Sequence, residues 1–179
     1  LVQMLMTVLG AVTSSIIPRM AYLVGKGDEK EAIALQKKTL NLLLYVSIPM
    51  VFGIIALAHP LILLFGGKEF LPAVPVMQIL STLLVIITLS GFLGNQILIP
   101  MHKEKYGNYC VGGGAIANLI VNFILIPLFA EIGVAIAVVI AETVVTAMHF
   151  YFAHRYMKLK WKDFVPVKCI LASILMFLV

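Results

Sequence analysis

The chain alternates long apolar runs with short polar connections. Apolar runs cover residues 1–17, 39–65, 75–99, 107–129, 133–153 and 164–179. Because a spanning helix needs about 20 predominantly apolar residues, we expect four complete spans in the middle and two truncated spans at the ends. The pattern predicts an all-α, polytopic transmembrane helical bundle of about six spans, with residues 1–179 forming a single lobe. Both ends lie inside apolar runs, so we expect the chain to be a fragment of a longer protein.

Composition strengthens the membrane assignment. Hydrophobic residues make up 62% of the 179 and charged residues 12%, whereas soluble domains carry roughly 45–50% apolar and about 25% charged residues. A net charge of +5 could suggest nucleic acid, but the basic residues lie in short clusters between the apolar runs. That arrangement is typical of membrane topology, so the lipid bilayer is an expected partner and nucleic acid is not.

The basic residues are distributed unevenly over the connections. The odd connections (18–38, 101–106 and 154–163) hold eleven Lys and Arg, and the even ones (66–72 and 130–133) hold only Lys68. In membrane proteins the excess of Lys and Arg marks the cytoplasmic loops. We therefore expect a multi-pass protein of the cell (inner or plasma) membrane, with its odd-numbered connections in the cytoplasm.

The first connection also contains the start of a helix. Asp28-Glu29-Lys30-Glu31 fits a capping box, in which the Asp28 side chain caps the helix and the Glu31 side chain reaches back. We expect this helix to run through Lys37 and Lys38 into the next span.

Motifs for enzyme chemistry are absent from the sequence. There is no paired-carboxylate arrangement, no His-x-x-x-His, no Cys-x-x-Cys and no Walker lysine. Cys110 and Cys169 have no metal-ligand spacing and are interpreted as small buried hydrophobes. We expect no catalytic residues, no cofactor and no metal site.

Polar residues inside the apolar runs are the candidate functional groups. Glu142 is the only acid at membrane depth, where an ionisable side chain is costly and should face a cavity or a partner. Thr146 and His149 follow it on the same helical face. Two other spans carry polar stripes, formed by Gly114, Asn118 and Asn122 and by Ser81, Thr88 and Asn95.

Two interpretations of these stripes are open. Amides and hydroxyls can simply hold helices together by hydrogen bonds. Such a role rarely needs a carboxylate, which favours a functional role for Glu142 as a site for a coupling ion, either a proton or sodium. The predicted substrate or ion pathway comprises Glu142, Thr146, His149, Asn118, Asn122, Asn95 and Thr88.

Several segments carry a family resemblance through their order and spacing. The first is Ile17-Pro18-Arg19-Met20 followed by Gly25-Lys26-Gly27-Asp28. The others are Ile48-Pro49 through Pro60 to the connection 64–70, Asn118-Leu119-Ile120-Val121-Asn122 with Ile126-Pro127, and residues 131–137. Together they resemble polysaccharide flippases of the O-antigen exporter type, within the multidrug/oligosaccharidyl-lipid/polysaccharide exporter superfamily, over essentially the whole chain.

The resemblance implies a two-lobe transporter of about twelve to fourteen helices. This chain would be most of the second, C-terminal lobe, and its partner lobe, the N-terminal lobe, is missing. The implied substrate is a lipid-linked oligosaccharide or polysaccharide precursor, which moves from the cytoplasmic to the outer leaflet by alternating access. The superfamily also contains the lipid II flippase and multidrug antiporters.

One feature departs from this family pattern. A pyrophosphate-linked lipid needs cationic partners, yet the spans hold no Arg or Lys near mid-membrane. Either the missing lobe supplies them, or Arg19 and Lys26 act at the cytoplasmic mouth. A cation-coupled multidrug antiporter is therefore the alternative. A membrane-embedded glycosyltransferase or polymerase should carry a longer soluble loop, and a structural membrane protein would not need its polar stripes.

The uneven loop charge gives a topological prediction. Cysteines placed at Glu69 and Glu131 should react with an impermeant thiol reagent added to intact cells, because both positions lie in weakly charged even connections. A cysteine at Lys158, in an odd connection, should react only after the membrane is opened. Labelling at Lys158 in intact cells would overturn the orientation.

Overall fold

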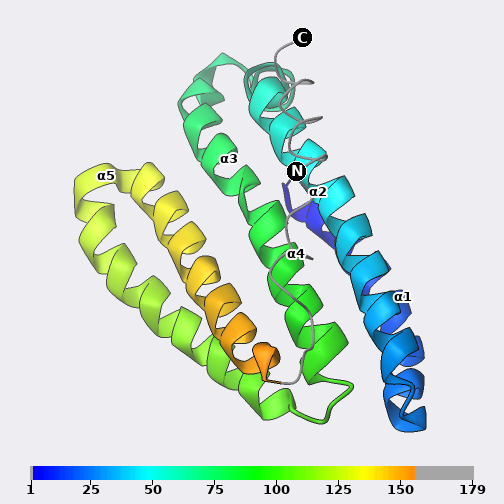
Figure 1. The fold of residues 1–179 in the computed structure, drawn as a ribbon. Helices are drawn as coiled ribbons and strands as arrows, with labels where there is room; N and C mark the ends of the chain where they lie inside the picture. The colour runs from blue at the N-terminus through cyan, green and yellow to red at the C-terminus, as the bar shows by residue number, and fades with distance from the viewer. Residues whose placement is uncertain (1, 156–179) are drawn as a thin grey trace.

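The described residues, 2–155 of a computed structural model, are helical throughout and joined by short turns (Figure 1). This confirms the all-α bundle predicted from the sequence. The expected run 164–179 lies outside the described residues. In chain order the elements are α1 (Val2–Lys26), α2 (Glu29–Gly66), η1 (Lys68–Ala73), α3 (Val74–Ser81), α4 (Leu83–Leu93), η2 (Gly94–Leu98) and α5 (Glu104–His154).

The first two helices form an antiparallel hairpin around Gly27. Helix α1 continues through Pro18 to Lys26, beyond the expected end of the first run at residue 17, and the chain reverses at Gly27 with φ of 75°. Glycine adopts this left-handed conformation without a Cβ clash. The Asp28 side chain then accepts from the Glu31 N–H at 3.2 Å, as the capping box predicts. The Glu31 carboxylate pairs instead with Arg19 across the turn, at 3.4 Å on the surface.

The third apolar run is interrupted rather than continuous. A short 3-10 helix, η1, leads into α3, and at the break after α3 the Thr82 N–H bonds to Ile79 O at 3.2 Å. Helix α4 then passes into η2, a turn of π-helix in which the Ile99 N–H reaches back to Gly94 O at 3.1 Å. A tight turn follows, with His102 at φ of 56°.

Helix α5 is a hairpin of two arms, residues 104–129 and 131–154. The reversal is at Ala130, where φ is 45° and ψ is −120°, three residues after Pro127. Glycines let the arms approach closely, because a Cβ at Gly133 would overlap the backbone carbonyl of Leu125 and one at Gly114 would overlap the Val145 side chain. The two arms contain the expected runs 107–129 and 133–153.

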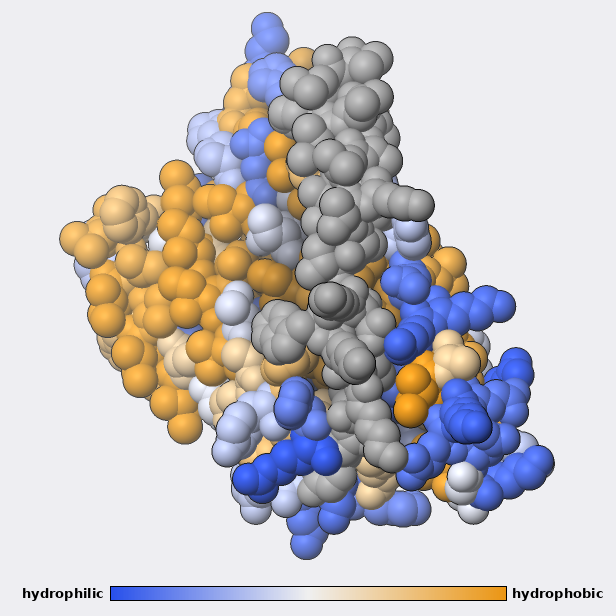
Figure 2. Space-filling view, in the orientation of Figure 1, coloured by the Kyte–Doolittle hydropathy of each residue, from blue (hydrophilic) through white to orange (hydrophobic). Residues whose placement is uncertain are grey.

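The arrangement matches a membrane bundle. The turn between α1 and α2 and the turn between η2 and α5 lie at one end, and η1 and the reversal within α5 lie towards the other (Figure 1). The segments Val2–Lys26, Glu29–Gly66, Lys68–Leu98 and Glu104–His154 are each long and apolar enough to cross a membrane. The buried core lies where α2, α4 and η2 meet, around Leu40, Leu84 and Phe92. Apolar side chains also cover the outer surface of α5, and hydrophilic ones gather at the Gly27 end (Figure 2). The chain is a multi-pass membrane protein.

The tight α5 hairpin gives a stability prediction. Gly133→Ala should lower the thermal stability of the full-length protein in detergent by about 1–3 kcal/mol, because the added methyl group must push the Leu125 backbone away. Gly112→Ala is the matched control on the same hairpin, since a Cβ there meets nothing within 4 Å. Equal melting temperatures for the two variants would contradict the close packing of the arms.

Candidate functional site

Thr146 and His149 attach the second arm of α5 to α4. The Thr146 hydroxyl lies 3.2 Å from Ile86 O and 2.8 Å from Glu142 O. One turn further on, His149 Nδ1 lies 2.9 Å from Ser90 Oγ, and both side chains are buried. The His149 ring also fills the space beside Gly94, where a Cβ would come within 3.4 Å of Nε2. These two residues share the face that spacing predicts, and that face binds α4.

Glu142 lies one turn before Thr146 on the same arm. The pairings of Thr146 with Ile86 and of His149 with Ser90 show that the arm runs parallel to α4. Extended by one turn, this register brings Glu142 to the level of Thr82, where the helix breaks between α3 and α4. The side chain is half-buried, and its carboxylate forms no hydrogen bond or ion pair with any described residue. Glu142 is therefore an available acid beside the junction of α3 and α4.

Asn118 and Asn122 lie on the first arm and interact with each other. The Asn122 amide donates to the Asn118 backbone carbonyl at 3.0 Å and to its side-chain oxygen. Both residues line an open groove of about 510 Å³ whose walls all come from residues 115–127. Glu142 is not among the lining residues. The structure thus does not gather these asparagines and Glu142 into one pocket.

Thr88 of α4 and Asn95 of η2 face away from α5, towards α1. With Thr13 of α1 they contribute the polar side chains of a cavity of about 160 Å³. The Thr13 hydroxyl donates to Leu9 O at 3.0 Å and the Thr88 hydroxyl donates to Leu84 O, so both oxygens can still accept hydrogen bonds. The complete lining is Met6, Leu9, Gly10, Thr13, Ile87, Thr88, Gly91 and Asn95.

Sequence reasoning missed a polar stripe on α1. Gln3, Thr7, Gly10 and Ser14 recur at helical spacing and are all exposed. The Thr7 and Ser14 hydroxyls donate to Gln3 O and Gly10 O, at 3.0 and 2.9 Å. The spacing of four, three and four residues was the available signal. Arg19 and Lys26 follow on the exposed side of the same helix.

The α1 stripe differs from the exposed face of the first arm of α5. Large apolar side chains cover the first arm of α5, where Ile120 is 53% and Phe123 is 76% exposed. That face suits lipid, whereas exposed glutamine and hydroxyl groups at membrane depth suit water or a polar partner. The α1 stripe is therefore the candidate surface of a transport path.

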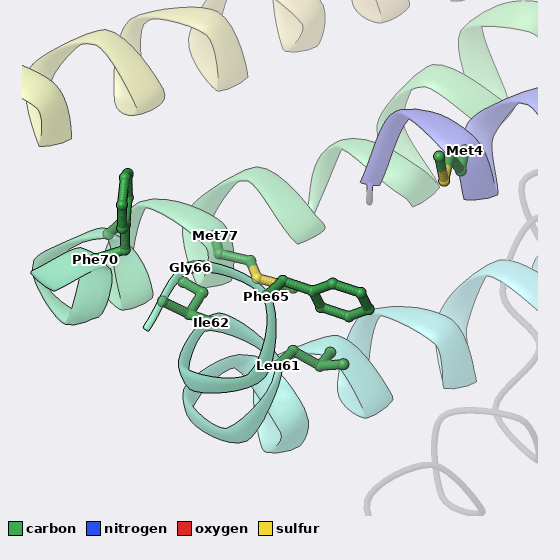
Figure 3. A pocket seen from close by; sticks show the side chains of 8 residues that line it. Met4, Leu61, Ile62, Phe65, Gly66, Phe70 and Met77 are labelled. Atoms are coloured by element: carbon green, nitrogen blue, oxygen red, sulfur yellow. The ribbon is translucent and has the colours of Figure 1, made fainter. Parts of the chain in front are cut away.

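A separate groove of about 390 Å³ lies at the Gly66 end of the bundle (Figure 3). Side chains of Phe65, Phe70 and Met77 form much of its wall, and Met4 of α1 lies beyond them. No polar side chain lines this groove, so it can accept a hydrocarbon chain but cannot recognise a sugar or an ion. Among residues 2–155, no three His, Cys, Asp or Glu side chains gather where a metal could bind.

Two curated proteins are similar to most of this chain. It is 23% identical over 166 residues to the probable low-salt glycan biosynthesis flippase Agl15 of Haloferax volcanii, a match that covers 93% of this chain and 35% of that protein. It is 30% identical over 154 residues to the putative O-antigen transporter of Escherichia coli, covering 80% of this chain and 34% of that protein. No family model matches.

The long apolar helices, with polar side chains on and between them, define a polytopic membrane protein. The two relatives support membership of the polysaccharide flippase family. This confirms the family resemblance seen in the sequence. The chain spans about a third of the length of these relatives, which are named as a flippase and a transporter rather than as enzymes.

The contrast between exposed faces gives an accessibility prediction. In full-length protein without its native cysteines, Thr7→Cys and Ser14→Cys should react with a small charged methanethiosulfonate, because only water ionises a thiol and admits the reagent. Ile120→Cys and Phe123→Cys, equally exposed but apolar in setting, should stay unlabelled. Unreactive cysteines on α1 would show that this face contacts lipid or protein and not water.

Proposed function

We propose that this chain is one lobe of a two-lobe transporter that moves a lipid-linked oligosaccharide from the cytoplasmic to the outer leaflet by alternating access. The observation that carries the proposal is the exposed polar stripe of α1, which contrasts with the large apolar side chains exposed on the first arm of α5. The names of the two relatives support the same substrate class. The eleven-to-one loop charge supports cytoplasmic odd connections in a cell membrane.

Each part of such a substrate has a chemically suited surface on the chain. A hydroxyl-rich glycan can exchange hydrogen bonds with Gln3, Thr7 and Ser14 along α1. Arg19 and Lys26 offer cations for a phosphate group at the mouth of the path, although Arg19 must first leave Glu31. The apolar groove at Phe65 suits the lipid chain. We propose that the missing lobe faces the α1 stripe across the path.

Glu142 is the proposed site of ion coupling. Its carboxylate has no partner among the described residues and lies level with the helix break at Thr82. A carboxylate can take up a proton or bind sodium, and either change alters its interaction with the surrounding helices. The same observation favours one second candidate function, a cation-coupled multidrug antiporter.

The coupling role gives a prediction for Glu142→Gln in the full-length protein. The amide keeps the shape but cannot bind a cation or release a proton, so transport should fall at least tenfold at normal abundance. Cells that depend on this variant should accumulate lipid-linked oligosaccharide with an intact glycan on the cytoplasmic leaflet, as a gene deletion does. Glu131→Gln, at the exposed tip of α5, is the control and should transport normally.

Mass spectrometry and a leaflet-specific lectin distinguish the outcomes. A shortened glycan on the accumulated lipid would indicate an enzyme and refute the flippase. Full transport by Glu142→Gln would leave Glu142 with a packing role only. Intact glycan export combined with drug sensitivity in the deletion strain would instead support the antiporter.

A further inference from the structure

The π-helical turn η2 carries an unpaired amide in the core of the bundle. Gln96 is fully buried, and neither its amide nitrogen nor its amide oxygen has a hydrogen-bond partner among the described residues. A buried amide without partners is strongly unfavourable. The preceding residue, Asn95, lines the cavity together with Thr13 and Thr88. A rotation of η2 by one residue would therefore bring the Gln96 amide to polar groups that can bond to it.

A π-turn is a movable irregularity in a helix. Its hydrogen bonds join residues five apart instead of four, so the turn contains one extra residue. If the extra residue passes to the previous turn, every residue in between rotates by about 100° relative to the earlier part of the helix. Gly91 and Gly94 flank that previous turn and carry no side chain to obstruct the change.

The rotation would exchange the residues that face α1 and α5. Contacts of Ile86 with Thr146 and of Ser90 with His149 hold α4 in place, so η2 is the part that turns. Gln96 would then take the present position of Asn95, facing Thr13 and Thr88. Asn95 would take the position of Gly94, beside His149 Nε2. Both amides would gain polar neighbours, at the cost of repacking Ile97 and Leu98 and of a shift of the His149 ring, which fills the space beside Gly94.

We propose that η2 is a register switch, in which the π-turn moves between residues 94–98 and the turn before them and Gln96 alternates between the core and the α1–α4 cavity. The switch changes the cavity wall that η2 presents to α1 and the contact of η2 with α5 together. Its use in transport rests on the proposed function, whereas the register change itself does not.

Cross-linking tests the register change directly. In full-length protein without native cysteines, Thr13→Cys is paired in turn with Asn95→Cys, Gln96→Cys and Ile97→Cys, and a short bis-methanethiosulfonate is added to membranes. A protease site in the Gly27 turn separates α1 from α4 unless the two are linked. We expect the Asn95 pair to link fastest and the Gln96 pair to link at least tenfold faster than the Ile97 pair, because Ile97 faces α1 in neither register.

A Gln96 pair as slow as the Ile97 pair would overturn the switch, and so would an Asn95 pair that does not link. The second test compares Gln96→Leu with Ser47→Ala, since each removes a buried polar group that has no partner. Both should fold and raise the melting temperature, but only Gln96→Leu should reduce transport, by at least tenfold. Wild-type transport by Gln96→Leu would refute the role in transport. Exchange of the cross-links without any glycolipid transport would refute the proposed function alone.

Discussion

Inside a bilayer, every backbone N–H and C=O needs a partner within the protein, and the described part of this chain is organised by that requirement. Regular helices satisfy it on their own, so the long outer faces of α2 and α5 can be covered with apolar side chains. The interruptions at Thr82 and in η2 lie in the segment packed between α1, α2 and α5. Away from the turns at the ends of the described helices, irregular backbone thus lies in this packed segment, where neighbouring helices exclude lipid.

Helix α4 consequently has two polar sides with different properties. Towards α5 the polar groups are paired, since Ser90 meets His149 and Thr146 meets the backbone of Ile86. Towards α1 the hydroxyls of Thr13 and Thr88 keep accepting capacity and border a cavity. One side therefore fixes the helix, and the other can change its contacts without losing hydrogen bonds. Conformational change in this bundle should begin on the α1 side.

Much of the fold could be predicted because apolar-run length and loop charge are strong signals. The reversal near Ala130 and the helix start at Asp28 were both expected from the sequence and both are present. The π-helical turn in the third run could not be predicted. Gly91, Gly94 and Gln96 are equally compatible with α-helical hydrogen bonds, which join residues four apart, and with π-helical ones, which join residues five apart. Gly27, rather than Pro18, ends α1 because a helix tolerates an internal proline but not a positive φ.

The candidate site was predicted less completely. Spacing correctly placed Thr146 and His149 on one face, but spacing cannot identify the neighbour which that face meets. Thr88 and Asn95 turned out to face α1, and Asn122 satisfies part of its hydrogen bonding with Asn118. The α1 stripe was missed because hydroxyls that bond to their own helix are weak signals one at a time. The α1 stripe can be recognised only from the exposure of its side chains in the structure.

The close pairing of the two α5 arms also bears on how the chain enters the membrane during synthesis. Between residues 107 and 153 the only formal charges are Glu131, at the tip of the hairpin, and Glu142. The tip is short and carries a single formal charge. The arms can therefore leave the translocon together as a preassembled pair, with the glycine contacts already made. A charged tag inserted at Ala130 would oblige each arm to insert separately, and the hairpin would have to assemble afterwards within the lipid.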